Sequence, residues 1–214
     1  DGSLFDAERA VFGAPACASV YRRELLRDCG GLDGAMEAYL EDVDLSLRAQ
    51  LLGFPCWYVP EARVRHRGSA SYGWGGRSGR AERLIARNRI RLLCRSMPRA
   101  ALRAGGPAAA ASIGVDILQR SLRRRHGLQA LLGTLEGLGA ARAALSERGI
   151  TLGRRRVDDA GILKVLRDSE EELQDLARSP QAGQWTRQRA SLARMLGTWT
   201  DRRERRMDRS SWLS

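Results

Sequence analysis

Three carboxylates fall within four positions of the chain, at Glu41, Asp42 and Asp44, and these residue types are suited to acid–base chemistry. A carboxylate held beside a reacting hydroxyl can take its proton as a general base. Acidic residues are also common in the first turn of a helix, because the helix dipole and free N–H groups favour negative charge there. That structural explanation is sufficient for any one of these carboxylates, so a catalytic role depends on the residues that accompany them.

His66 is the second candidate for chemistry. It ends the segment Arg63-Val64-Arg65-His66, whose alternation of polar and apolar residues predicts a short strand with Val64 and His66 on one face. An imidazole is a common metal ligand. A lone histidine at a strand end, however, is more often a surface or hydrogen-bonded residue.

The spacing of apolar residues predicts the elements that must position these candidates. An apolar stripe predicts a helix that Gly53 ends; it consists of Leu40, Val43, Leu47 and Leu51. Residues 11–20 are small and apolar and predict a buried strand or loop, followed by a short helix that stops at Gly30-Gly31. Residues 56–59 are β-prone and predict a strand that ends at Pro60.

The remainder of the chain predicts a loop and then helices. Residues 68–79 are rich in glycine and serine and predict a mobile loop, and residues 81–97 predict a helix that Pro98 stops. Three further helices are predicted from apolar stripes. The first contains Leu128, Leu131, Leu132, Leu135 and Leu138; the second is capped by Asp158 or Asp159 and turns Ile162, Val165, Leu166, Leu173 and Leu176 inward; the last contains Trp185, Leu192, Leu196 and Trp199.

The charge is unevenly distributed along the 214 residues. The formal net charge is +12, with 15 basic and 12 acidic side chains in residues 1–98 and 22 and 13 in residues 99–214. Such an excess favours an anionic partner surface, either phospholipid or nucleic acid, although solvated helix faces explain it equally well. The four cysteines, Cys17, Cys29, Cys56 and Cys94, contain no CxxC pair, so we expect neither zinc nor a disulfide framework.

The order of several short motifs resembles the family-two inverting glycosyltransferases, especially the rhamnosyltransferase-like branch. The resemblance covers residues 9–98. It rests on Val11-Phe12-Gly13-Ala14 through Tyr21-Arg22-Arg23, Gly30-Gly31-Leu32-Asp33, Tyr39-Leu40-Glu41-Asp42-Val43-Asp44-Leu45-Ser46-Leu47-Arg48, Val59-Pro60-Glu61-Ala62 with Val64-Arg65-His66, and Arg87-Asn88-Arg89. Each piece alone is weak, and their order and spacing together carry the resemblance.

The resemblance implies the fold class and the function. We expect an α/β fold, a partial GT-A-type glycosyltransferase domain comprising the acceptor-side half, followed by an α-helical C-terminal extension. The implied reaction transfers a sugar from a nucleotide-sugar donor to a hydroxyl of a glycan or lipid-linked acceptor with inversion, in cell-envelope polysaccharide synthesis. No Asp-x-Asp stands upstream of Asp42 in the expected context, so we expect the donor-binding half to be missing and this fragment to be inactive by itself.

The resemblance also implies roles for individual residues. Asp42 resembles the catalytic base, and Glu41 would orient the acceptor or the base. His66 resembles the third protein ligand of a divalent metal, Mn or Mg, whose site is incomplete in this chain. Five further positions or pairs are candidates for substrate binding: Asp44, Arg48, Ser69, Ser71, and Arg87 with Asn88. For Asp44, Arg48, Arg87 and Asn88 a structural role is the alternative, and loop solubility also explains the two serines.

The predicted organisation has three parts. Residues 1–98 form the C-terminal half of the catalytic domain, residues 99–150 form amphipathic, membrane-proximal helices, and residues 151–214 form a basic helical tail. In the family such helices often dock at the cytoplasmic membrane, so we expect a cytoplasmic location, peripheral on the inner face of the cell membrane. The alternative function is a nucleic-acid- or anionic-surface-binding helical protein without catalysis; no nucleic-acid motif is present, and nucleic acid is not expected as a partner. The oligomeric state is left open.

Overall fold

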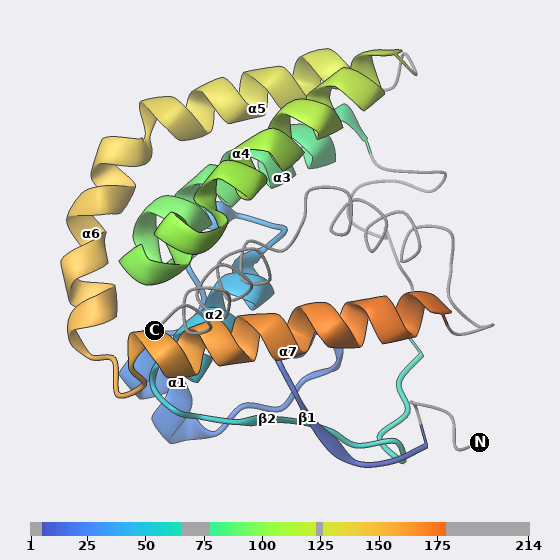
Figure 1. Ribbon diagram of the computed structural model, residues 1–214, viewed down its shortest axis with the longest axis vertical. Helices are drawn as coiled ribbons and strands as arrows, with labels where there is room; N and C mark the ends of the chain where they lie inside the picture. The colour runs from blue at the N-terminus through green and yellow to red at the C-terminus, as the bar shows by residue number, and fades with distance from the viewer. Residues whose placement is uncertain (1–5, 66–77, 123–125, 179–214) are drawn as a thin grey trace, which may run out of the picture.

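The computed structural model describes residues 6–65, 78–122 and 126–178 (Figure 1). Within these residues the chain forms seven α-helices, two short 3₁₀ turns and two short strands. The elements in chain order are β1 (Arg9–Val11), η1 (Ala16–Ala18), α1 (Arg23–Cys29), η2 (Gly34–Met36), α2 (Glu41–Leu51), β2 (Cys56–Tyr58), α3 (Gly79–Arg95), α4 (Arg99–Leu122), α5 (Gly127–Gly139), α6 (Ala141–Gly153) and α7 (Asp159–Arg178).

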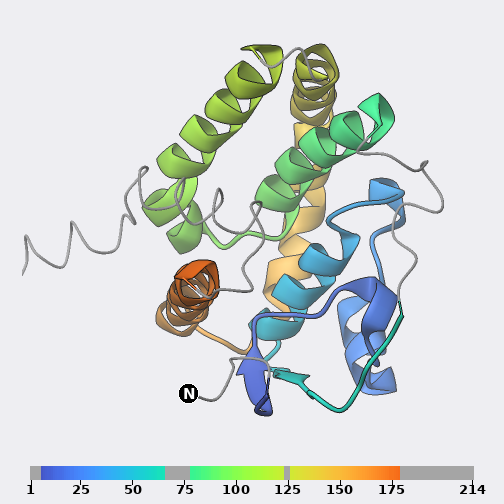
Figure 2. The same cartoon turned by 90° about the vertical axis from the view of Figure 1, so that its right-hand side faces the viewer.

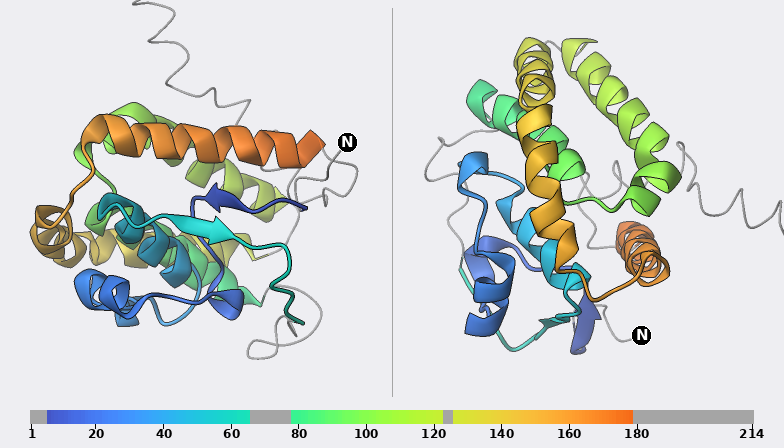
Figure 3. Two further views of the ribbon diagram at one scale, coloured as in Figure 1. Left: turned by 90° about the horizontal axis from the view of Figure 1, so that it is seen from below. Right: turned by 90° about the vertical axis from the view of Figure 1, so that its left-hand side faces the viewer.

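The predicted α/β fold class is wrong for the described part of the chain, which is mostly helical. Its sheet is a two-stranded antiparallel ribbon, in which Ala10 pairs with Trp57 (Figure 3). A GT-A-type core needs a sheet covered by helices on its faces. Here Trp57 at the centre of β2 is 56% exposed, so none of the described elements covers that face of the ribbon.

The predicted second strand at 63–66 is also not formed in its described part. Residues 63–65 are irregular and exposed, and Val64 is turned to solvent. The chain turns at residues 59–62 instead, where the Ala62 N–H donates to the Val59 carbonyl over 3.1 Å. Four alternating residues are too short a pattern to specify a strand without a neighbour to pair with.

Helix α2 lies at the centre of the N-terminal half, between α1 and α7 (Figures 2 and 3). The predicted helix is confirmed, and Gly53 with φ 78° follows its C-terminal end. The predicted stripe is only partly buried, because Leu40 precedes the helix and Val43 is exposed, while Leu47 and Leu51 are buried. Two apolar clusters flank α2. Leu45 and Ala49 pack with Leu25 of α1, while Leu47 and Leu51 pack with Ile162 of α7.

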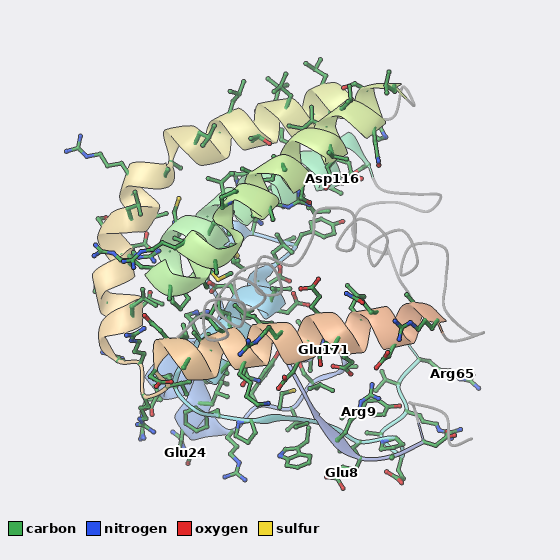
Figure 4. All side chains as sticks on the ribbon, viewed as in Figure 1. Glu8, Arg9, Glu24, Arg65, Asp116 and Glu171 are labelled. Carbon is green, nitrogen blue, oxygen red and sulfur yellow. The ribbon has the colours of Figure 1, made fainter. Side chains whose placement is uncertain are left out.

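Helices α3, α4, α5 and α6 form the second half of the molecule (Figure 1). Helix α3 begins at Gly79, two residues before the predicted start, and the Ser78 hydroxyl caps it by accepting the Ala81 N–H. Helix α5 lies closely along α3: a Cβ atom added at Gly133 would stand 2.1 Å from the Arg83 carbonyl oxygen. An ion pair between Arg89 and Asp116, with nitrogen and oxygen 2.9 Å apart, joins α3 to α4 (Asp116 is labelled in Figure 4).

Helix α7 lies over the two-stranded ribbon. Its N-terminus is capped by Asp158, whose carboxylate accepts the Gly161 N–H over 2.8 Å, as one of the two predicted caps. Ile162 is fully buried against α2. Farther along, Glu172 pairs with Arg9 of β1 at 2.8 Å, so the helix is tied to the ribbon (Arg9 is labelled in Figure 4).

Candidate active site at the start of helix α2

Asp42 lies in the first turn of α2, with its side chain partly exposed. Its two carboxylate oxygens are held from two sides. Oδ2 accepts the backbone N–H of Ala16 over 3.2 Å, and Oδ1 accepts the N–H of Val43 over 2.8 Å. The carboxylate is therefore oriented by backbone donors while it keeps access to solvent, which suits a group that takes a proton from an incoming hydroxyl.

The loop that carries Ala16 is pressed directly onto α2. A Cβ at Gly13 would stand 2.1 Å from the Ser46 Oγ, so only glycine allows this approach. Gln50, one turn farther along the same helix, donates its side-chain N–H to the Phe12 carbonyl over 2.9 Å. These two contacts fix the loop after β1 relative to the Asp42 carboxylate.

Glu41, the preceding residue, holds a carboxyl oxygen in an unusual environment. Its Oε2 is buried and has no hydrogen-bond partner. Burial raises the pKa of Glu41 above its ordinary value, and the charge of Asp42 raises it further, although a backbone hydrogen bond acts in the opposite direction. Two adjacent carboxyl groups thus occupy different settings, one satisfied by backbone donors and one with an unused acceptor.

Two hydroxyl oxygens are also buried without a partner, the Ser19 Oγ and the Tyr21 phenol oxygen. Tyr21 packs against the cluster that contains Leu45. Leu45 follows Glu41 by one helical turn, so both lie on the same side of α2. Buried polar atoms without partners are uncommon in folded proteins, and Glu41 and Tyr21 place two of them on this side of α2.

The backbone that leads into the two carboxylates is strained. Glu37, Tyr39 and Leu40 have φ values of 60°, 70° and 68°, in the left-handed region that side-chain-bearing residues seldom adopt. Each such residue costs on the order of 1 kcal/mol or more and persists only when its surroundings enforce it. Strain of this kind is often found at functional sites.

Asn88 of α3 enforces this conformation. Its side chain is fully buried and donates to the carbonyl oxygens of Met36, Ala38 and Tyr39 at 2.8, 2.9 and 2.8 Å. Arg87 supports the same loop from outside by donating to Glu37 Oε1 over 2.8 Å. The Asn88 Nδ2 donates only to backbone carbonyls, and its Oδ1 accepts the Arg87 Nε–H over 3.1 Å, so the contribution of Asn88 to the site is to position the loop before Glu41.

Asp44 and Arg48 are buried inside the fold and directed away from the Asp42 carboxylate. Their side chains are 0% and 4% exposed, and Arg48 contacts Asp44 Oδ2 through Nε at 2.8 Å. The guanidinium also donates to the carbonyls of Cys29 and Gly31, which end α1. Asp44 in addition accepts the Ser96 hydroxyl over 2.5 Å. Both residues join α2 to its neighbours, and neither is accessible to a substrate in this structure.

This ion pair continues into a larger network between α3 and α6. Arg91 contacts Asp33 Oδ2 at 2.7 Å and Glu147 at 2.8 Å, and Arg95 bridges Asp44 and Glu147. Burial would raise the pKa of Asp33, but the hydrogen bond from Arg91 and the charge of Arg95 hold it below its ordinary value. The network fixes the orientation of α2 with respect to α3 and α6.

The structure brings together only some of the predicted site residues. Glu41 and Asp42 are adjacent at the start of α2, with Arg87 and Asn88 behind the loop that precedes them. His66, Ser69 and Ser71 lie outside the described residues, as do Arg123–Arg125 and the predicted last helix with Trp185, Leu192, Leu196 and Trp199. The described part contains no group of three or more His, Cys, Asp or Glu side chains placed to hold a metal ion. The predicted metal therefore stays a prediction.

Several residues of this region were not singled out by their sequence pattern. Ser96, Arg91 and Arg95 pair with Asp33 and Asp44 across more than fifty positions of sequence, and no local spacing signals such contacts. Gly13 does carry a signal, because an isolated glycine at a strand end often marks a close backbone approach.

Comparison of the chain with protein-family models, with curated proteins and with solved structures gives no match. Among the described helices, none has the length and apolarity required to cross a bilayer.

Proposed function

We propose that the N-terminus of α2 supplies the general base for the transfer of a sugar from a nucleotide-sugar donor to an acceptor hydroxyl, with inversion. One observation supports it most: Asp42 is the carboxylate of its motif that is oriented yet partly exposed, whereas Asp44 is buried and paired with Arg48. The motif resemblance supplies the reaction class. The proposal rests on this local geometry and not on the α/β fold, which the described residues do not form.

The chemistry assigned to Asp42 is a single displacement. The acceptor hydroxyl gives its proton to the carboxylate while its oxygen forms a bond to the anomeric carbon, and the bond from that carbon to the nucleotide diphosphate breaks. The diphosphate leaves with the electron pair, and the configuration inverts because attack and departure occur on opposite faces. A base held within hydrogen-bond distance contributes about 10²- to 10⁴-fold in rate.

The other residues of the region position this base. The N–H groups of Ala16 and Val43 fix the carboxylate, and Asn88 fixes the strained loop before it. Glu41 directly precedes the base and is assigned the role of orienting either the acceptor or the base; its Oε2 is buried and has no hydrogen-bond partner.

The test is transfer activity in the full-length gene product that contains this chain. Asp42→Asn keeps the shape of the side chain and removes its basicity, so we expect kcat to fall by about 10²- to 10⁴-fold with little change in donor binding. Asp168→Asn is the matched control, because that aspartate lies on α7 in an exposed pair with Lys164. Turnover of Asp42→Asn within a few-fold of the parent would exclude Asp42 as the base.

The alternative function, binding to nucleic acid or another anionic surface, gains no specific support from the described residues. Several of their arginines are engaged in ion pairs between helices, such as Arg83 with Glu136 and Arg89 with Asp116. A salt-sensitive gel shift of DNA by the chain, together with no transfer activity in the full-length gene product, would favour that alternative.

A further inference from the structure

In an ordinary surface helix the large apolar residues face the protein. In α5 the small residues face the protein and four leucines face solvent. Ala130, Gly133 and Gly137 are buried against the body of the protein, and a Cβ at Gly137 would stand 2.9 Å from the Arg87 carbonyl oxygen of α3. The leucines face outward. Leu128, Leu131, Leu135 and Leu138 are 66%, 40%, 55% and 56% exposed, and Figure 4 shows side chains projecting from α5 away from α3 and α4.

We propose that these four leucines, the α5 seam, form a self-association surface that pairs with the α5 seam of a second copy in antiparallel orientation. The leucines are spaced by three, four and three positions, which is the narrow a/d pattern of a coiled-coil seam. Such a stripe matches the side chains of another helix better than the wide apolar face of a helix that lies in a lipid surface.

The order of the leucines is symmetric about Gly133. In an antiparallel pair, Leu128 therefore lies opposite Leu138 of the second copy, and Leu131 lies opposite Leu135. Each contact is then repeated by the two-fold axis, which is the condition for a closed dimer with the same patch on both subunits. Among antiparallel registers, no other one pairs all four leucines with leucines.

The charges of α5 also favour a second copy over an anionic membrane. Residues 127–139 contain no lysine or arginine, so the helix itself offers no cation to lipid phosphate. Its single charged residue, Glu136, is paired with Arg83 of α3. Two seams can therefore approach each other without like charges meeting across the interface.

The size of the seam predicts a weak dimer. Four partly exposed leucines on each copy bury less than the roughly 1,600 Å² of a standard interface, so the association should be reversible and depend on concentration. The inference does not depend on the proposed glycosyl transfer.

Sedimentation velocity of the chain over a hundredfold range of concentration tests the proposal. We expect a monomer–dimer equilibrium that Leu131→Glu and Leu135→Lys each weaken at least tenfold, since each places a charge in an apolar contact. Leu145→Glu on α6, at a leucine that is 51% exposed outside the seam, is the matched control and should dimerise like the parent. Circular dichroism checks that each variant is folded.

Mixing the two charged variants tests the orientation. In the antiparallel pair the introduced carboxylate at position 131 faces the introduced ammonium at position 135, so the mixture should dimerise more strongly than either variant alone. A parent chain that stays monomeric throughout would overturn the proposal. So would a monomer that binds vesicles of phosphatidylglycerol through the same leucines, because lipid would then be the occupant.

Discussion

The buried side chain of Asn88 donates a hydrogen bond to the carbonyl oxygen of Tyr39 over 2.8 Å, although the two residues are 49 positions apart. Through this contact helix α3 holds Tyr39, whose φ is 70° and which immediately precedes the Leu40-Glu41-Asp42 turn. The loop that leads into the candidate base is therefore held by a residue on another helix.

Substituting Asn88 should unfold the protein more easily and reduce activity. Asn88→Asp keeps the volume but replaces the Nδ2 donor by a carboxylate oxygen that faces three carbonyl oxygens, and Asn88→Ala removes the side-chain donor to those carbonyls. An unsatisfied buried polar group costs about 1–3 kcal/mol, so we expect a loss of at least 2 kcal/mol in either variant. Urea unfolding monitored by circular dichroism measures this loss. If Asn88→Asp is as stable as the parent, the contact does not maintain the strained loop.

Two ion pairs with the same sequence spacing should differ in their contribution to stability. Asp44–Arg48 and Lys164–Asp168 are both four positions apart on a helix, but the first is buried and the second is exposed. Asp44→Ala leaves a buried guanidinium without its partner and should cost about 3–5 kcal/mol. Asp168→Ala should cost less than about 1 kcal/mol. Equal losses of unfolding free energy in the two variants would contradict the assigned burial of Asp44.

The stability of the protein should depend on the protonation of Glu41. Its pKa is raised in the folded chain, so the folded state binds more protons than the unfolded state between the ordinary value of 4.5 and the raised folded value. The contribution of Glu41 is then most favourable below pH 4.5 and is lost as the pH rises through the folded pKa. Glu41→Gln should therefore be more stable than the parent at neutral pH, with a difference that disappears toward pH 4.

Urea unfolding of both proteins at several pH values between 4 and 8 measures this difference. Glu24→Gln is a suitable control, because Glu24 also lies in the first turn of a helix but is exposed. A difference between parent and Glu41→Gln that does not change with pH would contradict the burial of the Glu41 carboxyl.

A methyl group at position 13 should separate the loop after β1 from α2. The Cβ of Gly13→Ala would stand 2.1 Å from the Ser46 Oγ and 2.3 Å from its Cβ, so the loop must move. Overpacking of this kind costs about 1–3 kcal/mol, and the displaced Ala16 N–H would no longer hold Asp42. Gly34→Ala is the control, since nothing lies within 4 Å of a Cβ there. Unfolding and transfer assays should show reduced stability and activity for Gly13→Ala but not for Gly34→Ala.

The local elements of this protein were predictable where a pattern repeats over a helix. The stripe from Leu40 to Leu51 predicted α2, the glycine pair predicted the end of α1, and Pro98 marked the end of the α3 region. The face of α5 that packs against the protein was not predictable in this way. Its leucines predicted an amphipathic helix without saying what its apolar face meets, and the close approach of Gly133 and Gly137 to α3 turns four of them outward, because only glycine allows two helix backbones to come so near.

The sequence by itself determined the ends of α1 and α2 and the cap of α7, and it placed three carboxylates in the first turn of α2, because caps, breakers and periodic apolar residues act over a few positions. The tertiary structure decided that the two strands form an isolated ribbon, that Asp44 and Arg48 are buried while Asp42 is accessible, and that Asn88 holds the loop before the site. These features depend on contacts between residues far apart in the chain. Local spacing does not specify such contacts, since they form only when the helices pack together.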